Sequence, residues 1–477
     1  MKEYDIIAIG TGSAMNIITG VMDNNPDMKI AVIDKDEPGG ICLTKGCIPT
    51  KILLYPAEII RTVQQAKKFG IDADIKKIDF KQIMNRMRDI IGHDMQNIKQ
   101  GLSSAKELDF YNATAEFIDD YTLQVGNEKI KGKTILLCTG SKPTIPKIDG
   151  LDKVDYHTSD SILYIKDLPE IITIIGGGYI AAEYGHFFSS MGAKVIILGR
   201  NKQFLPQEEP EVSALAKKEL SKHMTIYTNH EVKKVEKLKD GKIKTIAINR
   251  ETKKEFEVIS SEILVATGRS SLSDILHPEK SGIKTDKNGW IIVNEFLETT
   301  KSNIWAFGDA IGKYLFKHAA NYESQIVYYN AILKKETPVD FHAIPHAVFT
   351  DPEVAGVGLG EKQAIEKFGK DNVIIGFQRF QDTAKGLAMD VEDFFVKIIV
   401  ERESMDIVGA HIIGPFASVL IQEIINIMYT DERSVFTLMR SMHIHPALNE
   451  VVERAAGNLM TVDHYHHFLP HLGLDSE

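Results

Sequence analysis

Several kinds of residue and segment are scarce in this 477-residue chain, and each scarcity excludes a class of protein. Three cysteines are too few for the disulfide scaffold that proteins build in an oxidising compartment. No uninterrupted apolar run approaches the roughly 18 residues that a membrane span needs. The net charge is −10, so no basic excess indicates nucleic acid or an anionic membrane. We therefore expect neither a membrane nor a nucleic acid among its partners.

The remaining composition, 43% hydrophobic and 26% charged residues, is that of an ordinary globular protein. A chain of this length exceeds what one core can hold, which predicts about two to four domains. Its first residues show no cationic region followed by a small-residue cleavage site. We therefore expect no secretory signal and a cytoplasmic location.

Two of the three cysteines, Cys42 and Cys47, lie five positions apart in the glycine-rich segment 39–51. A regular helix would separate them by about 7.5 Å along its axis, whereas a disulfide needs Cα atoms closer than about 7 Å. The backbone must therefore bend, as Gly46 and Pro49 allow. The pair could be a redox-active disulfide, a structural disulfide, half of a metal site or two buried thiols.

The start of the chain has the pattern of a dinucleotide-binding unit. A short apolar strand at residues 4–9 runs into a turn that contains Gly10 and Gly12, and a helix-like segment follows. Such glycines let backbone amides approach a pyrophosphate at a helix N-terminus. The next strand ends on Asp34, placed to accept hydrogen bonds from a ribose. Met15 stands where a third glycine is usual, which predicts a locally different packing.

This opening repeats in the middle of the chain. A β-branched strand at residues 171–175 precedes Gly176, Gly177 and Gly178, and a second strand follows at 194–198. Two nucleotide units beside one cysteine pair suggest an electron chain, in which one cofactor delivers hydride and another relays electrons to a disulfide. A structural disulfide becomes the weaker interpretation.

The two units differ where the second strand ends. Gly199 occupies the place of Asp34 and is followed by Arg200. An acid there favours a free ribose hydroxyl, whereas an arginine favours a 2′-phosphate. We expect NADPH to be used at least as well as NADH, with Arg200 and Lys202 on the phosphate. The alternative is that Arg200 is a solvated surface residue.

The intervening segments predict the remaining organisation. Residues 52–105 have helical periodicity, 108–148 alternate like strands around an inert buried thiol at Cys138, and 229–265 resemble a hairpin. The expected domains are a first dinucleotide-binding unit (1–147), a second dinucleotide-binding unit (148–270), a central segment (271–342) and a separate C-terminal domain (343–477).

The last domain contains the segment His443-Ile444-His445-Pro446-Ala447-Leu448-Asn449-Glu450. A histidine held by a carboxylate is a ready base near neutral pH, although such spacing alone is more often structural. The tail from His464 to His471 could bind a metal. It lacks regular ligand spacing, so we expect an adaptable aromatic tail and no metal.

Three motifs carry a family resemblance: Cys42-x4-Cys47-Ile48-Pro49-Thr50-Lys51, residues 350–358 (TDPEVAGVG), and His445-Pro446 with Glu450. From Gly10 to about Ala456 the chain resembles class I pyridine nucleotide–disulfide oxidoreductases, most closely their dihydrolipoamide dehydrogenase branch. The resemblance implies an α/β fold with two Rossmann-like domains, for FAD and NAD(P), and a C-terminal α+β dimerisation domain.

The resemblance also implies roles for single residues. Cys42 would exchange with substrate, Cys47 would lie against the flavin, and Lys51 would pair with Glu183 near it. His445, oriented by Glu450, would be the base and would come from the partner of an obligate homodimer. The implied FAD-binding residues are Gly10, Gly12, Ser13, Asp34, Gly40, Lys51, Gly140, Asp309 and Ala320. The implied NAD(P)-binding residues are Gly176, Gly178, Tyr179, Ile180, Arg200, Lys202 and Gly268.

The sequence departs from the branch pattern beside the cysteines. Ile41 replaces a threonine, and Thr44-Lys45 replaces Asn-Val. Lys45 could lower a cysteine pKa or face solvent.

Dihydrolipoamide, free or on a lipoyl-carrying protein, is the expected substrate. The alternative is an NADPH-dependent reductase of another small disulfide, of the glutathione or mycothiol kind. A mercuric reductase is less expected because no cysteine pair lies near the C-terminus. A non-catalytic subunit is also less expected, because Cys42, Cys47, His445 and Glu450 are all present.

Overall fold

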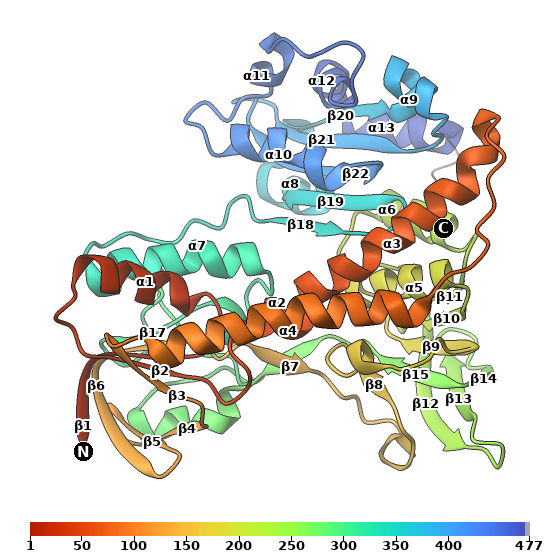
Figure 1. Cartoon of the computed structure of the whole chain (residues 1–477). Coiled ribbons are helices and arrows are strands. Elements are labelled where there is room, and N and C mark those ends of the chain that lie inside the picture. Colours follow the sequence, from red (N-terminus) through yellow and green to blue (C-terminus); the bar gives the residue numbers. More distant parts are fainter. Residues whose placement is uncertain (473–477) are drawn as a thin grey trace.

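The computed structural model describes residues 1–472, which form two parallel-sheet units and a C-terminal antiparallel unit (Figure 1). In Figure 1 the first sheet lies at the lower left, the second at the right, and the C-terminal sheet above them. This arrangement confirms the predicted fold class. None of the helices in the described part combines the length and apolar composition that a bilayer crossing requires.

The first unit is a seven-stranded sheet in the order β3-β2-β1-β6-β5-β4, with β17 paired to β6. Its parallel strands are short apolar segments buried on both faces, as expected where helices cover a sheet. The strands are β1 (Lys2–Ile9), β2 (Ile30–Ile33), β3 (Leu108–Tyr111), β4 (Ala115–Asp119), β5 (Thr122–Val125), β6 (Glu128–Leu137) and β17 (Ile304–Ala306). Because β17 joins this sheet, the chain returns to the first unit after building the second.

The second unit is a five-stranded parallel sheet in the order β11-β10-β9-β15-β8. Its strands are β8 (His157–Thr158), β9 (Ile171–Ile175), β10 (Lys194–Leu198), β11 (Thr225–Tyr227) and β15 (Glu262–Val265). The predicted hairpin is an antiparallel sheet of β12 (His230–Lys237), β13 (Ile243–Asn249) and β14 (Glu255–Ser260). A two-stranded ribbon, β7 (Ser141–Pro143) with β16 (Arg269–Ser271), links the two units.

The C-terminal unit is a six-stranded antiparallel sheet. Its strands are β18 (Pro345–Val348), β19 (Glu353–Gly358), β20 (Val373–Arg379), β21 (Phe395–Glu401), β22 (Ile407–Gly414) and β23 (Leu459–Thr461). The helices around it are α8 (Glu361–Phe368), α9 (Ala384–Met389), α10 (Ala417–Met428), α11 (Val435–Arg440), α12 (Glu450–Gly457) and α13 (Val462–Phe468). The exact domain boundaries stay predictions.

Two long helices, α3 (Cys47–Gln65) and α4 (Phe80–Ser104), run side by side between the units (Figure 1). Helix α4 begins at Asp79, whose side chain accepts a hydrogen bond from the Gln82 backbone N–H at 3.1 Å. The predicted helical region is therefore correct except for residues 66–79, which form a 3₁₀ turn and an irregular segment. Helix α3 places the cysteine segment at the centre of the molecule.

The histidine-rich tail is not the adaptable segment that its sequence suggested. Helix α13 packs on the C-terminal sheet, and Tyr465 is fully buried with its hydroxyl donating to Glu211 at 2.7 Å. His466 Nε2 lies 2.5 Å from Glu361. An aromatic ring at this position can pack into a core, which composition alone did not indicate. His471 lies outside the residues whose side chains are described.

Candidate active site

A cavity of about 2080 Å³ lies between the three units. It is lined by the glycine turns of both nucleotide units, the cysteine segment and the first turn of α7 (Lys317–Val327). The predicted site residues that line it are Gly10, Gly12, Ser13, Asp34, Gly40, Cys42, Cys47, Lys51, Gly140, Gly176, Gly178, Tyr179, Ile180, Glu183, Arg200, Gly268, Asp309 and Ala320. Lys202, His445 and Glu450 do not line it.

The first glycine turn leaves a cradle beside the N-terminus of α1 (Ala14–Asn24). A Cβ on Gly40 would lie 2.6 Å from Gly12 Cα, so only glycine lets these two backbone segments meet. Asp34 accepts a hydrogen bond from Thr11 N at 2.9 Å, which fixes its carboxylate at the end of β2. Thr139 Oγ1, which also faces this cavity, is buried without a hydrogen-bond partner. The donor and acceptor set therefore fits the phosphates and ribose of a dinucleotide such as FAD.

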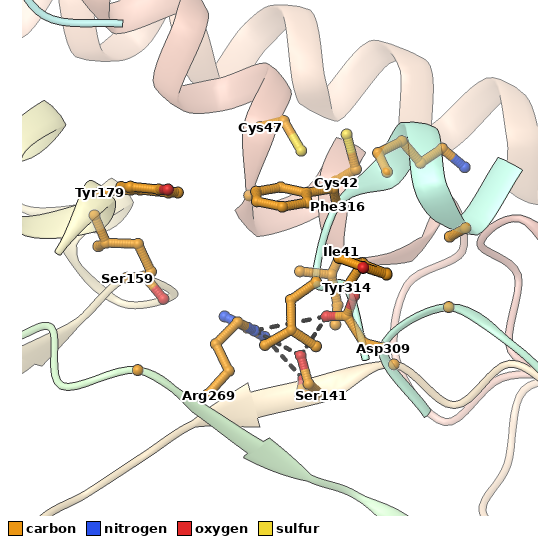
Figure 2. A pocket seen from close by; sticks show the side chains of 18 of the residues that line it. Ile41, Cys42, Cys47, Ser141, Ser159, Tyr179, Arg269, Asp309, Tyr314 and Phe316 are labelled. Atoms are coloured by element: carbon orange, nitrogen blue, oxygen red, sulfur yellow. Dashed lines mark hydrogen bonds and ion pairs between the residues drawn. The ribbon is translucent and has the colours of Figure 1, made fainter. Parts of the chain in front are cut away.

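A hydrogen-bonded triad, absent from the sequence prediction, closes the floor of the cavity. Ser141 Oγ donates to Asp309, and Arg269 Nε donates to Ser141 Oγ at 2.6 Å (Figure 2). Burial raises the pKa of Asp309, while Ser141 and Arg269 oppose that effect. Ser141 and Arg269 lie on the paired strands β7 and β16, so the ribbon brings together residues from both nucleotide units.

The cysteine segment bends between its two cysteines, as predicted. Cys42 lies in α2 (Gly40–Lys45) and Cys47 begins α3, with Gly46 between the helices at φ −128° and ψ −115°. A Cβ on Gly46 would lie 2.9 Å from the carbonyl oxygen of Ile41, so the bend needs glycine. Both cysteines are free thiols here, and both face the cavity (Figure 2).

The two thiols share a proton. A hydrogen bond from Cys47 lowers the pKa of Cys42 to about 7, and the charge of Lys317 contributes to the same shift. Holding that proton raises the pKa of Cys47. Lys45 is partly exposed and pairs with Asp36 at 3.2 Å, and it is not among the causes of the lowered Cys42 pKa. The cation that acts on Cys42 is Lys317, which no sequence motif indicated.

An ion pair lies beside Cys47. Lys51 Nζ contacts both oxygens of Glu183, at 2.8 and 2.7 Å, which joins α3 to α5 (Tyr179–Met191). Glu183 also accepts from Phe349 N at 3.1 Å, and the Phe349 ring lies 4.5 Å from Lys51 Nζ. The predicted pair therefore forms, and the C-terminal unit contributes to holding it.

The second glycine turn ends at Tyr179, the first residue of α5. Its hydroxyl donates to Glu208 at 2.7 Å, and its ring stacks on His346, with centroids 5.7 Å apart. His346 Nε2 also contacts Glu208, at 3.0 Å. These contacts fix the ring of Tyr179 across the cavity from Cys42 and Cys47 (Figure 2).

The end of β10 is open and cationic. Arg200 is exposed at the rim of the cavity, and Arg250 Nη1 donates to its carbonyl oxygen at 3.0 Å. Arg250, on the loop between β13 and β14, was not predicted, because no sequence motif indicates that this hairpin returns to the end of β10. Lys202 is exposed and lies outside the cavity lining, so its expected place on a 2′-phosphate is not supported.

His445 and Glu450 form the expected contact, with Nδ1 2.9 Å from Oε1. This hydrogen bond is the largest cause of the lowered pKa of Glu450. The His445 side chain is 66% exposed and faces away from the cavity of its own chain, on the C-terminal unit. The chain therefore does not bring His445 to its own cysteines.

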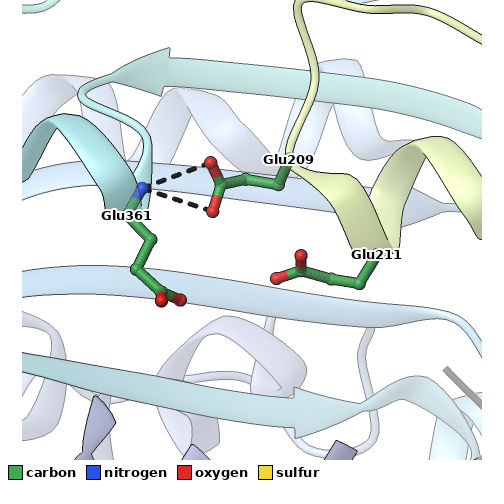
Figure 3. A group of neighbouring side chains, drawn as sticks. All are labelled: Glu209, Glu211 and Glu361. Carbon is green, nitrogen blue, oxygen red and sulfur yellow. Dashed lines mark hydrogen bonds between the residues drawn. The ribbon is translucent and has the colours of Figure 1, made fainter. Parts of the chain in front are cut away.

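Three glutamates gather where the second unit meets the C-terminal unit: Glu209, Glu211 and Glu361 (Figure 3). Their carboxylates have the spacing of metal ligands. The Lys397 ammonium lies among them, however, at 2.6, 2.6 and 2.8 Å. The cluster is thus a buried ion-pair network that joins two units.

Comparisons with known proteins agree with this geometry. Residues 4–325 match the family described as pyridine nucleotide-disulphide oxidoreductase, and residues 344–456 match its dimerisation domain. The chain is 34% identical to mycothione reductase of Mycobacterium tuberculosis over 466 residues, covering 95% of this chain and 99% of that one. It is 31% identical to dihydrolipoyl dehydrogenase of Synechocystis over 474 residues, covering 95% and 98%.

Among solved structures, the Cu(II) complex of the HOCl-induced flavoprotein disulfide reductase RclA from Escherichia coli superposes with a TM-score of 0.84. The two sequences are 25% identical, and the match covers 96% of this chain and 99% of that one. FAD and NAD(P)H are typical of the matched family, and its dimerisation domain supports a homodimer.

Proposed function

Because the chain belongs to the pyridine nucleotide–disulfide oxidoreductase family, we propose that it is an NADPH-driven reductase of a small disulfide. Family membership makes it an FAD-dependent flavoprotein with a redox-active pair, Cys42 and Cys47. The proposal of NADPH rests on one observation: β10 is followed by Gly199 and Arg200, where β2 of the first unit is followed by Asp34. An arginine in the place of that acid favours a phosphate over a free ribose hydroxyl.

The residues that would hold FAD are the first glycine turn, Asp34 and the Ser141–Asp309–Arg269 triad. When bound, FAD supplies the two-electron chemistry that connects nicotinamide with sulfur. The chain itself supplies a proton-sharing thiol pair on one side and Tyr179 on the other. Lys51 and Glu183 fix α3 against α5, which keeps Cys47 in place relative to the nucleotide units.

The thiol chemistry follows from the pair's shared proton. In the reduced enzyme the Cys42 thiolate attacks one sulfur of the substrate disulfide, forming a mixed disulfide and releasing one thiolate. That thiolate takes a proton from His445 of the partner subunit. Cys47 then gives its proton to the neutral His445 of the partner subunit and attacks the Cys42 sulfur, so that the second thiolate leaves and takes up that proton, and the Cys42–Cys47 disulfide remains.

A substrate panel tests the proposal. Purified holoenzyme should reduce mycothiol disulfide or another small disulfide with NADPH, and NADH should support a lower kcat/KM. Lipoamide and glutathione disulfide belong in the same panel. A higher kcat/KM with NADH than with NADPH would contradict the proposed cofactor preference.

Dihydrolipoamide oxidation is the second candidate, and the similarity to dihydrolipoyl dehydrogenase across 95% of the chain favours it. The apolar side chain of Ile48, 41% exposed beside Cys47, suits the hydrocarbon arm of a lipoyl group. Reduction of NAD⁺ by dihydrolipoamide, faster than any NADPH-dependent disulfide reduction in the panel, would establish this direction instead. The cytoplasmic location and the sharing of active sites between subunits belong to the proposal as well.

A further inference from the structure

The loop between α11 and α12 contains two histidines, and each contacts a different glutamate. His445 Nδ1 lies 2.9 Å from Glu450, while His443 Nε2 lies 2.5 Å from Glu423 on α10. Their exposure differs sharply: 66% for the His445 side chain against 5% for that of His443. His445 can meet another molecule, whereas His443 is packed inside its own domain.

The contacts of His443 define a two-point clamp. Its Nδ1 lies 3.0 Å from the carbonyl oxygen of Ser441, an atom that can only accept, and its Nε2 faces the Glu423 carboxylate. Both ring nitrogens of His443 are therefore engaged within its own domain.

Within its own chain, the surrounding loop has few other anchors. Residues 442–444 have no helical or strand structure, and the side chains of Met442 and Ile444, on either side of His443, are 99% and 76% exposed. The clamp thus ties the backbone at Ser441 to α10 through a buried side chain. His445 is two residues further along the same backbone, so its position depends on where His443 is held.

We propose that His443 and Glu423 are positioning residues, which hold the loop so that His445 meets the cysteine pair of the partner subunit. The proposal rests on the role proposed above for His445. Proton transfer needs heavy atoms within about 3 Å, and a displacement of about 1 Å can cost about 100-fold in rate. A loop tied only at α11 and α12 would lose that precision without losing His445 itself.

Rapid mixing of the holoenzyme dimer separates this effect from the rest of turnover. NADPH is first mixed with oxidised enzyme to give the rate of flavin reduction, and prereduced enzyme is then mixed with lipoamide to give the rate of disulfide reduction. His443→Asn and Glu423→Ala should slow disulfide reduction about 10- to 100-fold and leave flavin reduction within twofold. Glu423→Gln retains an acceptor oxygen and should recover most of the rate.

Two further variants make the experiment specific. The double variant His443→Asn/Glu423→Ala should be no slower than the slower single variant, because both residues act through one contact. His157→Asn is the control: His157 Nε2 contacts the Glu262 carboxylate at 3.3 Å, and neither residue lines the cavity. It should leave disulfide reduction unchanged even if it lowers thermal stability.

His445→Ala separates the positioning role of His443 and Glu423 from the proton-transfer role of His445. If it slows disulfide reduction while Glu423→Ala and His443→Asn do not, the positioning role is wrong and the role of His445 stands. If His445→Ala also has no effect, the proposed role of His445 fails. Should His443→Asn not assemble, Glu423→Ala decides the question, because the Glu423 side chain is already 30% exposed and its loss disturbs less packing.

Discussion

The two nucleotide units have the same glycine turn, although they are proposed to bind different nucleotides. A Cβ on Gly10 would lie 2.1 Å from the Cys138 carbonyl oxygen, and a Cβ on Gly176 would lie 2.1 Å from that of Ala266. Both glycines have positive φ, 110° and 140°. The turn is thus pressed against the neighbouring strand in each unit, which opens the helix N-terminus toward the cavity. This part of the fold does not distinguish one dinucleotide from another.

The units differ where the second strand ends. The residue after that strand donates its backbone N–H to the next strand in both units, Asp34 to Tyr111 O at 3.0 Å and Gly199 to Tyr227 O at 2.8 Å. Only Asp34 carries a carboxylate, which accepts from Thr11 N at 2.9 Å. Arg200 and Arg250 then stand near the rim of the cavity, with no carboxylate in the place of Asp34. The two units therefore share a scaffold and differ in the side chains that follow the second strand, which are the residues proposed to select the nucleotide.

Replacing the first glycine of each turn should have the largest effect. Each replacement should impair nucleotide binding in its own unit and leave the other unit intact. Gly10→Ala and Gly176→Ala each force a side chain into a carbonyl oxygen at a φ that costs about 1–3 kcal/mol before any clash. Gly10→Ala should abolish flavin binding, whereas Gly176→Ala should keep flavin and lose its reduction by NADPH. Flavin absorbance per chain and stopped-flow reduction distinguish the outcomes. Equal flavin loss in both variants would contradict the separate assignment of the units.

The third cysteine, Cys138, occupies the position that Ala266 has in the second unit. Its thiol can be compared with that of Cys42 by the pH at which each becomes reactive. The pKa of Cys42 is lowered to about 7, first by the Cys47 hydrogen bond, while burial raises that of Cys138 to about 11. At pH 7 about half of Cys42 but only about one in 10⁴ of Cys138 would be thiolate.

Iodoacetamide should therefore label Cys42 of the reduced enzyme, with a rate that rises between about pH 6 and 8 and then levels off. Cys138 should stay unlabelled throughout this range. Lys317→Gln should move the Cys42 profile to higher pH, since the lysine charge favours the thiolate. Peptide mass spectrometry gives the site of labelling, and comparable labelling of Cys138 would refute the contrast.

The preference for NADPH over NADH should depend on the residues that follow β10, Gly199 and Arg200. Arg200→Ala should raise the KM for NADPH about 10- to 50-fold through lost charge-assisted hydrogen bonds, and leave that for NADH nearly unchanged. Gly199→Asp, which imitates the first unit, should improve NADH relative to NADPH. Lys202→Ala is the control and should change neither KM by more than about twofold. An unchanged KM for NADPH in Arg200→Ala would remove the support for a 2′-phosphate site.

Cys138→Ala should have the smallest effect, because it makes the first unit resemble the second at this position. The thiol carries no charge at neutral pH, and the loss of one buried sulfur should cost about 1 kcal/mol or less of unfolding free energy. Flavin content and turnover should stay within twofold of wild type. Thermal melts and steady-state kinetics measure both quantities, and loss of flavin would reveal a role for this sulfur in cofactor binding.

Sequence patterns predicted what depends on neighbouring residues. The glycine turns, Asp34, the bend at Gly46 and the Lys51–Glu183 contact all follow from short motifs whose geometry is local or shared by a family. Patterns could not indicate the contact of Arg269 with Ser141, which joins residues 128 positions apart through the β7–β16 ribbon. Nor could they show which lysine acts on Cys42, because Lys317 begins α7, far from α2 in the sequence.

The electron relay from NADPH through flavin to Cys42 and Cys47 is the central claim, and anaerobic titration with NADPH tests it most directly. Wild-type enzyme should take up two hydride equivalents per chain, one for FAD and one for the cysteine disulfide, with a long-wavelength absorbance band after the first. Cys47→Ser should bind flavin, take up a single equivalent and lack the band. Uptake of two equivalents by Cys47→Ser, or of one by wild type, would contradict the relay.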